Sequence, residues 1–309
     1  MMSSHLIMRR VLLTAAQNAV VTGFVRRYGM RLGAARFVAG ESLDECVVVL
    51  RRLNEAGLLT NTTVLGESVR DAAMTRQVAE TYVAVLDRIQ REGLRTTLAV
   101  KLTHLGLEIG DELAYENIRR LTVHAGELGN FVRIDMEDSP RVDATLRIYR
   151  RLREDGLANI GTVLQSYLYR SEADLRALLP LRPNLRIVKG AYLEPPGIAY
   201  PRKADVDRNF VRLAEPMLLE GGFTAIATHD ERIIAHCIDF IRAHQVPRDR
   251  FEFQMLYGVR PRLQTDLVRR GFTVRVATPH GRDWYPYLMR RLAERPANVL
   301  FMVRNLLRA

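Results

Sequence analysis

The chain has 309 residues but only two cysteines, Cys46 and Cys237. Two isolated thiols provide neither a disulfide framework nor a CxxC zinc site, and this usage favours a reducing compartment, with the cytoplasm as the default. Lysine is also scarce, because only three of the 46 basic residues are lysines, at positions 101, 189 and 203. Since arginine is the usual basic residue in this chain, each lysine is a candidate for a specific role.

Long apolar runs and common hydrolase motifs are absent as well. No uninterrupted apolar stretch approaches the roughly 18 residues that mark a membrane-spanning helix, so the sequence predicts no transmembrane span. The chain has no HExxH and no GxSxG motif, and its seven histidines are scattered. These absences argue against hydrolysis by zinc or by an activated nucleophile. A metal site built from Asp135, His229 and Asp230 is the weaker alternative, and no metal is expected.

The charge balance is strongly basic. Lys and Arg number 46 against 35 Asp and Glu, which gives a formal net charge of +11 and a pI near 10.1. Such a balance favours a nucleic-acid or anionic-membrane partner. The basic residues, however, are spread in ones and twos and stand beside acids, as in residues 150–155. We therefore predict an arginine-rich solvated surface and no nucleic-acid partner, and we keep a basic nucleic-acid-binding protein as the alternative class of function.

The first 40 residues combine several arginines with apolar residues at helical spacing and contain no acid. This pattern predicts a basic amphipathic helix. Packing against its own domain is the favoured interpretation, and contact with a membrane surface is the second. An export signal built on Arg9 and Arg10 is the third and weakest, because Gln17 and Asn18 interrupt the apolar stretch.

Short β-branched runs alternate with long amphipathic segments after a helical pattern over residues 42–56. Predicted strands begin near residues 61, 97, 131, 160, 185, 224, 251 and 273, about 22 to 39 residues apart, which is the length of a βα unit. Eight such units predict an α/β fold: a (β/α)8 TIM-type barrel over residues 61–309 with an N-terminal helical extension over residues 1–60. A doubly wound open sheet is the alternative, but the GxGxxG and GxxxxGK motifs that often accompany it are absent.

Polar residues interrupt the predicted strands, mostly near their carboxyl ends, where a TIM-type barrel carries its active site. A lone polar residue in a barrel is most often a satisfied structural hydrogen bond, but residues of this kind on so many strands favour a site. The residues concerned are Lys101, Asp135, Glu137, Gln165, Arg186, Lys189, Thr228, His229, Asp230, Glu252 and Gln254.

The segment GRDWYPYLMRRLAE follows the last predicted strand and opens a helix. Tyr287, Arg290, Arg291 and Glu294 stand at i, i+3, i+4 and i+7, so they share one helix face. Two adjacent guanidinium groups suit a carboxylate, and the tyrosine one turn earlier supplies a ring wall or a hydroxyl. The alternative is a surface helix with a ladder of glutamate–arginine pairs.

Six ordered segments resemble the proline dehydrogenase family in its single-function bacterial form. They are FVRIDMED (131–138), VLQSYLYR (163–170), LRIVKGAYLEP (185–195), ATHDERII (227–234), FEFQMLYG (251–258) and GRDWYPYLMRRLAERPANVLF (281–301). The resemblance implies a (β/α)8 barrel that binds FAD noncovalently and oxidises L-proline to (S)-1-pyrroline-5-carboxylate by hydride transfer to flavin N5. It also implies transfer of electrons to membrane quinone, pyrroline-5-carboxylate dehydrogenase as a downstream partner, and a cytoplasmic location with a peripheral contact on the inner face of the membrane.

The same resemblance implies roles for individual residues. Substrate binding falls to Arg290 and Arg291 with help from Lys101, while Tyr287 and Glu294 line the pocket. Asp135 positions Lys101 and the arginines, and Arg186 acts near flavin N5, so Asp135 and Arg186 are the catalytic candidates. The remaining flavin-binding candidates are Met136 and Gln165 beside the isoalloxazine ring, Lys189, Gly190 and Ala191 beneath the ring and phosphates, Thr228 and His229 toward the other FAD contacts, and Arg202 on the adenosine side.

One position departs from the family pattern. The eighth predicted strand carries Ala277 where the family usually has a tyrosine that closes the pocket over the substrate ring. A methyl group in place of a phenol leaves room for a ring substituent or a water molecule. We therefore expect weak discrimination against 4-hydroxyproline or another substituted imino acid.

Overall fold

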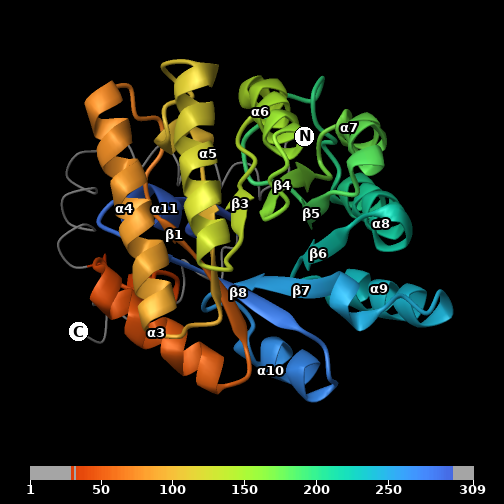
Figure 1. Ribbon diagram of the computed structural model, residues 1–309. Helices are drawn as coiled ribbons and strands as arrows, with labels where there is room; N and C mark the ends of the chain where they lie inside the picture. Colours follow the sequence, from red (N-terminus) through yellow and green to blue (C-terminus); the bar gives the residue numbers. More distant parts are fainter. Residues whose placement is uncertain (1–28, 31–32, 295–309) are drawn as a thin grey trace.

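The computed structural model describes residues 29–30 and 33–294. Eight parallel strands close into a barrel, because β8 pairs with β1 as well as with β7 (Figure 1). The predicted TIM-type barrel is confirmed. The strands are β1 (Leu59–Val64), β2 (Thr96–Val100), β3 (Val132–Ile134), β4 (Ile160–Gln165), β5 (Asn184–Val188), β6 (Phe223–Ala227), β7 (Phe251–Leu256) and β8 (Val274–His280).

Helices follow the strands and surround the barrel, as the α/β alternation predicts (Figure 1). The α-helices are α3 (Leu43–Glu55), α4 (Ala72–Arg91), α5 (Asp111–Glu127), α6 (Val142–Glu154), α7 (Ser171–Leu178), α8 (Lys203–Glu220), α9 (Glu231–Ala243), α10 (Pro261–Arg269) and α11 (Trp284–Glu294). Short 3-10 helices are η1 (Ala34–Arg36), η2 (Leu102–His104), η3 (Ser139–Arg141), η4 (Leu179–Leu181) and η5 (Arg248–Arg250).

The two faces of each strand have different chemistry, and β7 shows why. Phe251 and Phe253 are buried and pack with Phe272 in the apolar layer between strands and helices. Side chains alternate along a strand, so the intervening residues Glu252 and Gln254 point into the barrel. The apolar residues of the strands therefore anchor the helices, while polar residues fill part of the barrel interior.

Helix α3 confirms the helical pattern predicted over residues 42–56. Ser42 and Glu45 form a capping box at its start, and the buried residues Cys46 and Leu50 face inward. The helix packs on β1 and β8. The domain boundary at residue 60 stays a prediction, and most of the predicted basic N-terminal helix lies outside the described residues.

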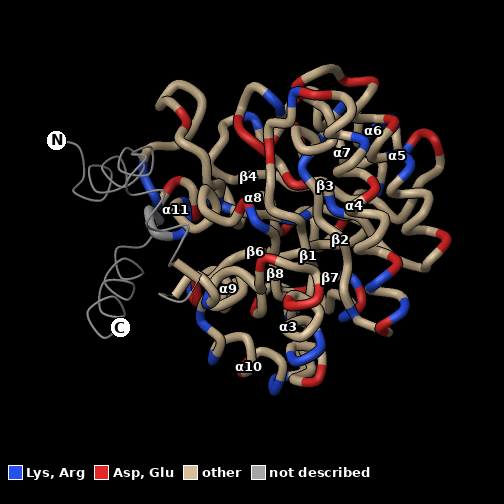
Figure 2. The backbone as a smooth tube through the Cα atoms, turned by 90° about the vertical axis from the view of Figure 1, so that its left-hand side faces the viewer, with Lys and Arg blue, Asp and Glu red and all other residues tan. Residues whose placement is uncertain are grey.

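Charges of both signs are interspersed over the described part of the chain (Figure 2). Many arginines pair with acids of a neighbouring helix, for example Arg120 with Glu80 and Arg151 with Glu112. This distribution agrees with the predicted mixed, solvated surface. Among residues 29–30 and 33–294, no helix is both long enough and apolar enough to span a membrane.

Candidate active site

A cavity of about 1240 Å³ opens at the carboxyl ends of the strands. This volume exceeds the roughly 300–1,000 Å³ of typical small-molecule sites, so the cavity has room for more than one small ligand. It brings together most of the residues that the sequence analysis singled out. Those in its lining are Lys101, Asp135, Met136, Gln165, Arg186, Lys189, Gly190, Ala191, Thr228, His229, Asp230, Gln254, Ala277, Tyr287, Arg290 and Arg291.

Of the singled-out residues whose side chains the structure describes, Glu137, Glu252 and Arg202 are not among these. Arg202 precedes α8, and its side chain is 78% exposed and paired with Asp205. The next residue, Lys203, lines the cavity instead. Arg202 is the N-cap with an extended backbone and Lys203 is the first helical residue, so their side chains point in different directions. The side chain of Glu294 lies outside the described residues, so its predicted place on the helix face stays a prediction.

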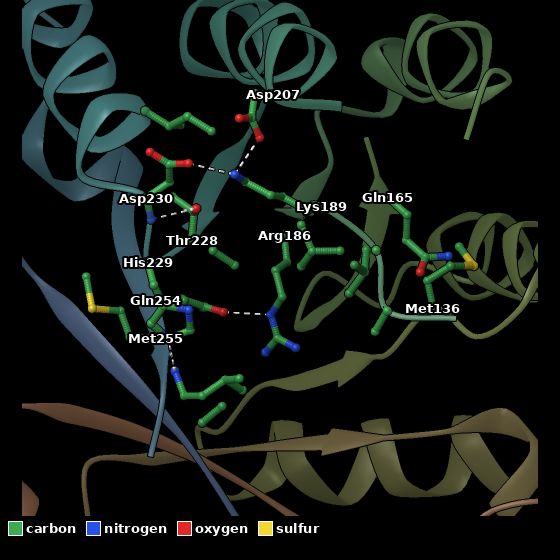
Figure 3. Close-up of a pocket in the computed structure, with 18 of the residues that line it drawn as sticks. Met136, Gln165, Arg186, Lys189, Asp207, Thr228, His229, Asp230, Gln254 and Met255 are labelled. Atoms are coloured by element: carbon green, nitrogen blue, oxygen red, sulfur yellow. Dashed lines mark hydrogen bonds and ion pairs between the residues drawn. The ribbon is translucent and has the colours of Figure 1, made fainter. Parts of the chain in front are cut away.

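Arg186 occupies the middle of the cavity wall and is held from two sides (Figure 3). Its Nη1 donates to Asp135 Oδ1 at 2.5 Å, and its Nε donates to Gln254 Oε1 at 2.6 Å. The two acceptors come from the end of β3 and from β7. Because a guanidinium is planar, two bonds in different directions fix its orientation. Asp135 thus contacts Arg186, whereas the predicted partner Lys101 bonds to another carboxylate.

That carboxylate is Glu67, which lies between β1 and α4 and was not singled out from the sequence. It accepts from Lys101 Nζ and from Arg290, whose Nη1 lies 2.7 Å from Glu67 Oε1. Burial disfavours the ionised form of Glu67, but the charges of Lys101 and Arg290 outweigh burial and lower its pKa to about 2. Lys101 and Arg290 therefore converge on one carboxylate, as a clamp for an anionic ligand requires.

Helix α11 confirms the predicted shared face for three of its four residues. Tyr287, Arg290 and Arg291 all line the cavity. The guanidinium of Arg291 lies 5.3 Å from the centre of the Tyr287 ring. Burial raises the pKa of the nearby Tyr192 phenol well above its usual range, so the ring remains neutral. This end of the cavity thus combines cations with neutral aromatic walls.

A second group of charges lies on the opposite side of Arg186 from Met136 and Gln165 (Figure 3). Lys189 Nζ bonds to Asp207 Oδ1 at 2.5 Å and to Asp230 Oδ2 at 2.9 Å. Lys203 bonds to the same two carboxylates. Burial would raise the pKa of Asp230, but the two ammonium groups hold it well below its usual range. Further arginines of this region that line the cavity are Arg208, Arg212, Arg232 and Arg260.

Gly190 shapes the backbone beneath the cavity. Its φ is +112°, and an added Cβ would lie 2.2 Å from the ring of Tyr167. Only glycine tolerates both this backbone conformation and this close approach. The VKGAY segment therefore places Lys189, Gly190, Ala191 and Tyr192 along one wall of the cavity.

The three residues of the alternative metal site, Asp135, His229 and Asp230, bond to separate partners. His229 Nε2 accepts the Leu256 N–H at 2.9 Å, Asp135 bonds to Arg186, and Asp230 bonds to the lysines. Within the part of the chain that the structure describes, no group of three or more His, Cys, Asp and Glu side chains is arranged to hold a metal ion.

The family model described as proline dehydrogenase matches residues 46–304. The chain belongs to the proline dehydrogenase family. Proline dehydrogenase 1 of Bacillus subtilis (strain 168) is 42% identical and aligns over 97% of this chain and 99% of its own. Proline dehydrogenase of Deinococcus radiodurans is 44% identical, over 97% and 98% of the two chains. The predicted resemblance is confirmed.

A solved structure agrees on the fold. Proline utilization A from Bdellovibrio bacteriovorus, inactivated by N-propargylglycine, superimposes with a TM-score of 0.82 at 23% sequence identity. The match covers 93% of this chain but only 36% of that protein. At this low identity the likeness supports the barrel architecture alone.

Several site residues escaped the sequence analysis, above all Glu67, Tyr192 and Asp207. Glu67 stands three residues beyond the end of β1. The rule that barrel sites form at strand carboxyl ends would have singled it out. Tyr192 lies inside the quoted VKGAY motif, and Asp207 lies one helical turn after Lys203, a lysine already conspicuous by rarity.

Proposed function

We propose that this member of the proline dehydrogenase family oxidises L-proline to (S)-1-pyrroline-5-carboxylate with FAD as the hydride acceptor. The observation that carries the proposal is the meeting of two anion-binding groups in one cavity. Lys101 and Arg290 converge on a carboxylate at one end, and the lysine pair Lys189 and Lys203 lies at the other. Arg186 stands in the same cavity wall.

The donor set of the cavity suits FAD. A flavin ring needs a flat, partly apolar wall with hydrogen-bond donors at its edge, and Met136, Gln165 and Arg186 supply these features. A pyrophosphate needs fixed cations, and Lys189 and Lys203 are held in place by carboxylates. When bound, FAD would supply the acceptor for a hydride at its N5 atom.

The substrate carboxylate would bind Arg290 and Arg291 with help from Lys101. Because Glu67 already bonds to two of these cations, an incoming carboxylate joins or replaces it there. Fixing the carboxylate would also fix the position of the ring carbon that loses the hydride. This positioning would raise the reaction rate by more than the gain in affinity alone. Tyr287 and Tyr192 would shield the imino acid ring from water.

Arg186 would act electrostatically. Asp135 and Gln254 already orient its guanidinium, so with FAD bound this cation would stabilise negative charge on the flavin without reorganising. Asp135 therefore acts on the reaction through Arg186.

The remaining proposals rest on the family resemblance. We propose membrane quinone as the final electron acceptor, pyrroline-5-carboxylate dehydrogenase as the enzyme that consumes the product, and a cytoplasmic location with a peripheral membrane contact. We also propose that Ala277, which lines the cavity, leaves space above the substrate ring for the hydroxyl of 4-hydroxyproline.

An absorption spectrum tests the function directly. The purified protein, loaded with FAD, is expected to be yellow and to lose its flavin absorbance when L-proline is added without oxygen. Pyrrolidine, which lacks the carboxylate, is the matched control and is expected to bleach the flavin far more slowly. A colourless protein that ignores added FAD, or one that binds nucleic acid in a salt-dependent manner instead, contradicts the proposal.

A further inference from the structure

A buried ion pair lies inside the barrel, beyond the residues that line the cavity. Arg275 Nε of β8 donates to Glu252 Oε1 of β7 at 2.7 Å, and the two side chains are 15% and 3% exposed. Arg275 Nη1 also donates to Thr60 O at 2.9 Å and to Thr97 Oγ1 at 3.3 Å. These bonds fix Arg275 against β1 and β2, on the far side of the barrel from Arg186.

Glu252 connects this pair to the cavity. Its Oε1, which accepts from Arg275, also accepts from Gln254 Nε2. An ionised carboxylate only accepts hydrogen bonds, so it forces the NH2 end of the amide to face it. The opposite end of the amide, Oε1, then faces Arg186 and accepts from its Nε at 2.6 Å. A continuous chain of hydrogen bonds thus runs from Thr60 to Arg186.

Stability alone does not account for such a pair. Removing two charges from water costs several kcal/mol per ion, and replacing a buried ion pair by apolar residues is often neutral or stabilising. Glu252 and Arg275 do not line the cavity, so neither is placed to contact a ligand. What the pair does determine is the direction in which the Gln254 amide points.

We infer that Glu252 and Arg275 are positioning residues for Arg186. By fixing the Gln254 amide with its oxygen toward Arg186, they hold the guanidinium in the orientation that would present its other N–H groups to a bound flavin. This inference rests on the proposed function. A reversed amide would point its NH2 group at Arg186. Two hydrogen-bond donors would then face each other without an acceptor, and the guanidinium would turn away.

The test removes the pair without changing net charge, in the variant Glu252→Met/Arg275→Met. Its FAD-loaded form is expected to have a lower flavin midpoint potential than the wild type, because Arg186 no longer stabilises the reduced flavin. Reduction by L-proline is expected to slow about 10- to 100-fold. The KM for proline stays within about twofold, since the carboxylate clamp is untouched. A thermal melt checks that the variant is folded.

Two further variants separate hydrogen bonding from charge. Glu252→Gln loses the charge but keeps the shared oxygen, so it is expected to retain most of the wild-type rate without a fall in potential. Gln254→Met removes the link itself and is expected to reproduce the fall, which provides the test if the double variant does not fold. Wild-type potential and rate in Gln254→Met or in the folded double variant overturn the inference, as does an equal fall in Glu252→Gln. If the wild type itself holds no FAD, the proposed function has failed instead.

Discussion

Replacing Arg290 by methionine tests the carboxylate clamp most directly. Methionine keeps much of the packing volume and removes the cation, whose Nη1 and Nη2 bond to Glu67 at 2.7 and 3.3 Å. Truncating one partner of a buried, hydrogen-bonded charge pair costs about 2–5 kcal/mol. The Arg290 side chain is 23% exposed, so solvent screening favours the lower half of that range. At about 1.4 kcal/mol per tenfold, the KM for proline is expected to rise about 30- to 300-fold.

Steady-state kinetics with proline and pyrrolidine provide the assay. In Arg290→Met the preference for proline over pyrrolidine is expected to fall by the same factor as kcat/KM for proline, because only proline carries the carboxylate. FAD content, read from absorbance, is expected to be unchanged. Arg282→Met is the matched control, since Arg282 is exposed in the same segment and lies outside the cavity lining. A KM within threefold of wild type, or an unchanged preference, refutes the clamp.

Three other changes test separate parts of the cavity. Because the pKa of Glu67 is lowered to about 2, its ion pairs add stability above the unfolded pKa that is lost as pH falls toward 2. After discounting for partial exposure, Glu67→Gln is therefore expected to lower the free energy of unfolding by about 1–2 kcal/mol at pH 7 and by much less near pH 2. Urea titrations measure this loss, and an equal loss at both pH values contradicts the prediction. Lys189→Met is expected to raise the FAD dissociation constant about tenfold in fluorescence titrations, and an unchanged constant removes Lys189 from the cofactor site. Ala277→Tyr is expected to lower kcat/KM for trans-4-hydroxyproline relative to proline at least about tenfold, whereas a wild type that already rejects hydroxyproline ends that idea.

The barrel could be predicted because its signal is local. Each strand is a short β-branched run, and each predicted start lies within two residues of the observed one, as for residue 61 against Leu59 and residue 273 against Val274. The spacing of the strand starts also predicted the succession of eight βα units along the chain. Closure could not be read from spacing, since it depends on the pairing of β8 with β1, two segments more than 200 residues apart.

The site could be predicted only in part, for a similar reason. Arg186 stands in a patterned strand, Arg290 stands in a patterned helix and Lys101 directly follows a patterned strand, so periodicity places them. Glu67 stands in a loop, where the strand-end rule marks a candidate position but only the approach of β2 and α11 selects Lys101 and Arg290 as its partners. The partner of Asp135 was also missed, because strand order places several cations near it and only side-chain geometry selects Arg186.

Five cations of the cavity share one arrangement, because each of them is already bonded to an acid. Glu67 holds Lys101 and Arg290, Asp135 holds Arg186, and Asp207 with Asp230 holds the lysine pair. Cations oriented in advance do not need to be reorganised when a carboxylate, a pyrophosphate or a developing flavin charge arrives, so more of the interaction energy serves binding and rate. The same acids limit affinity, because they compete with an incoming anion. The acids of this cavity therefore favour orientation over tight binding, which agrees with the proposed function, because its product is an anion that must be released.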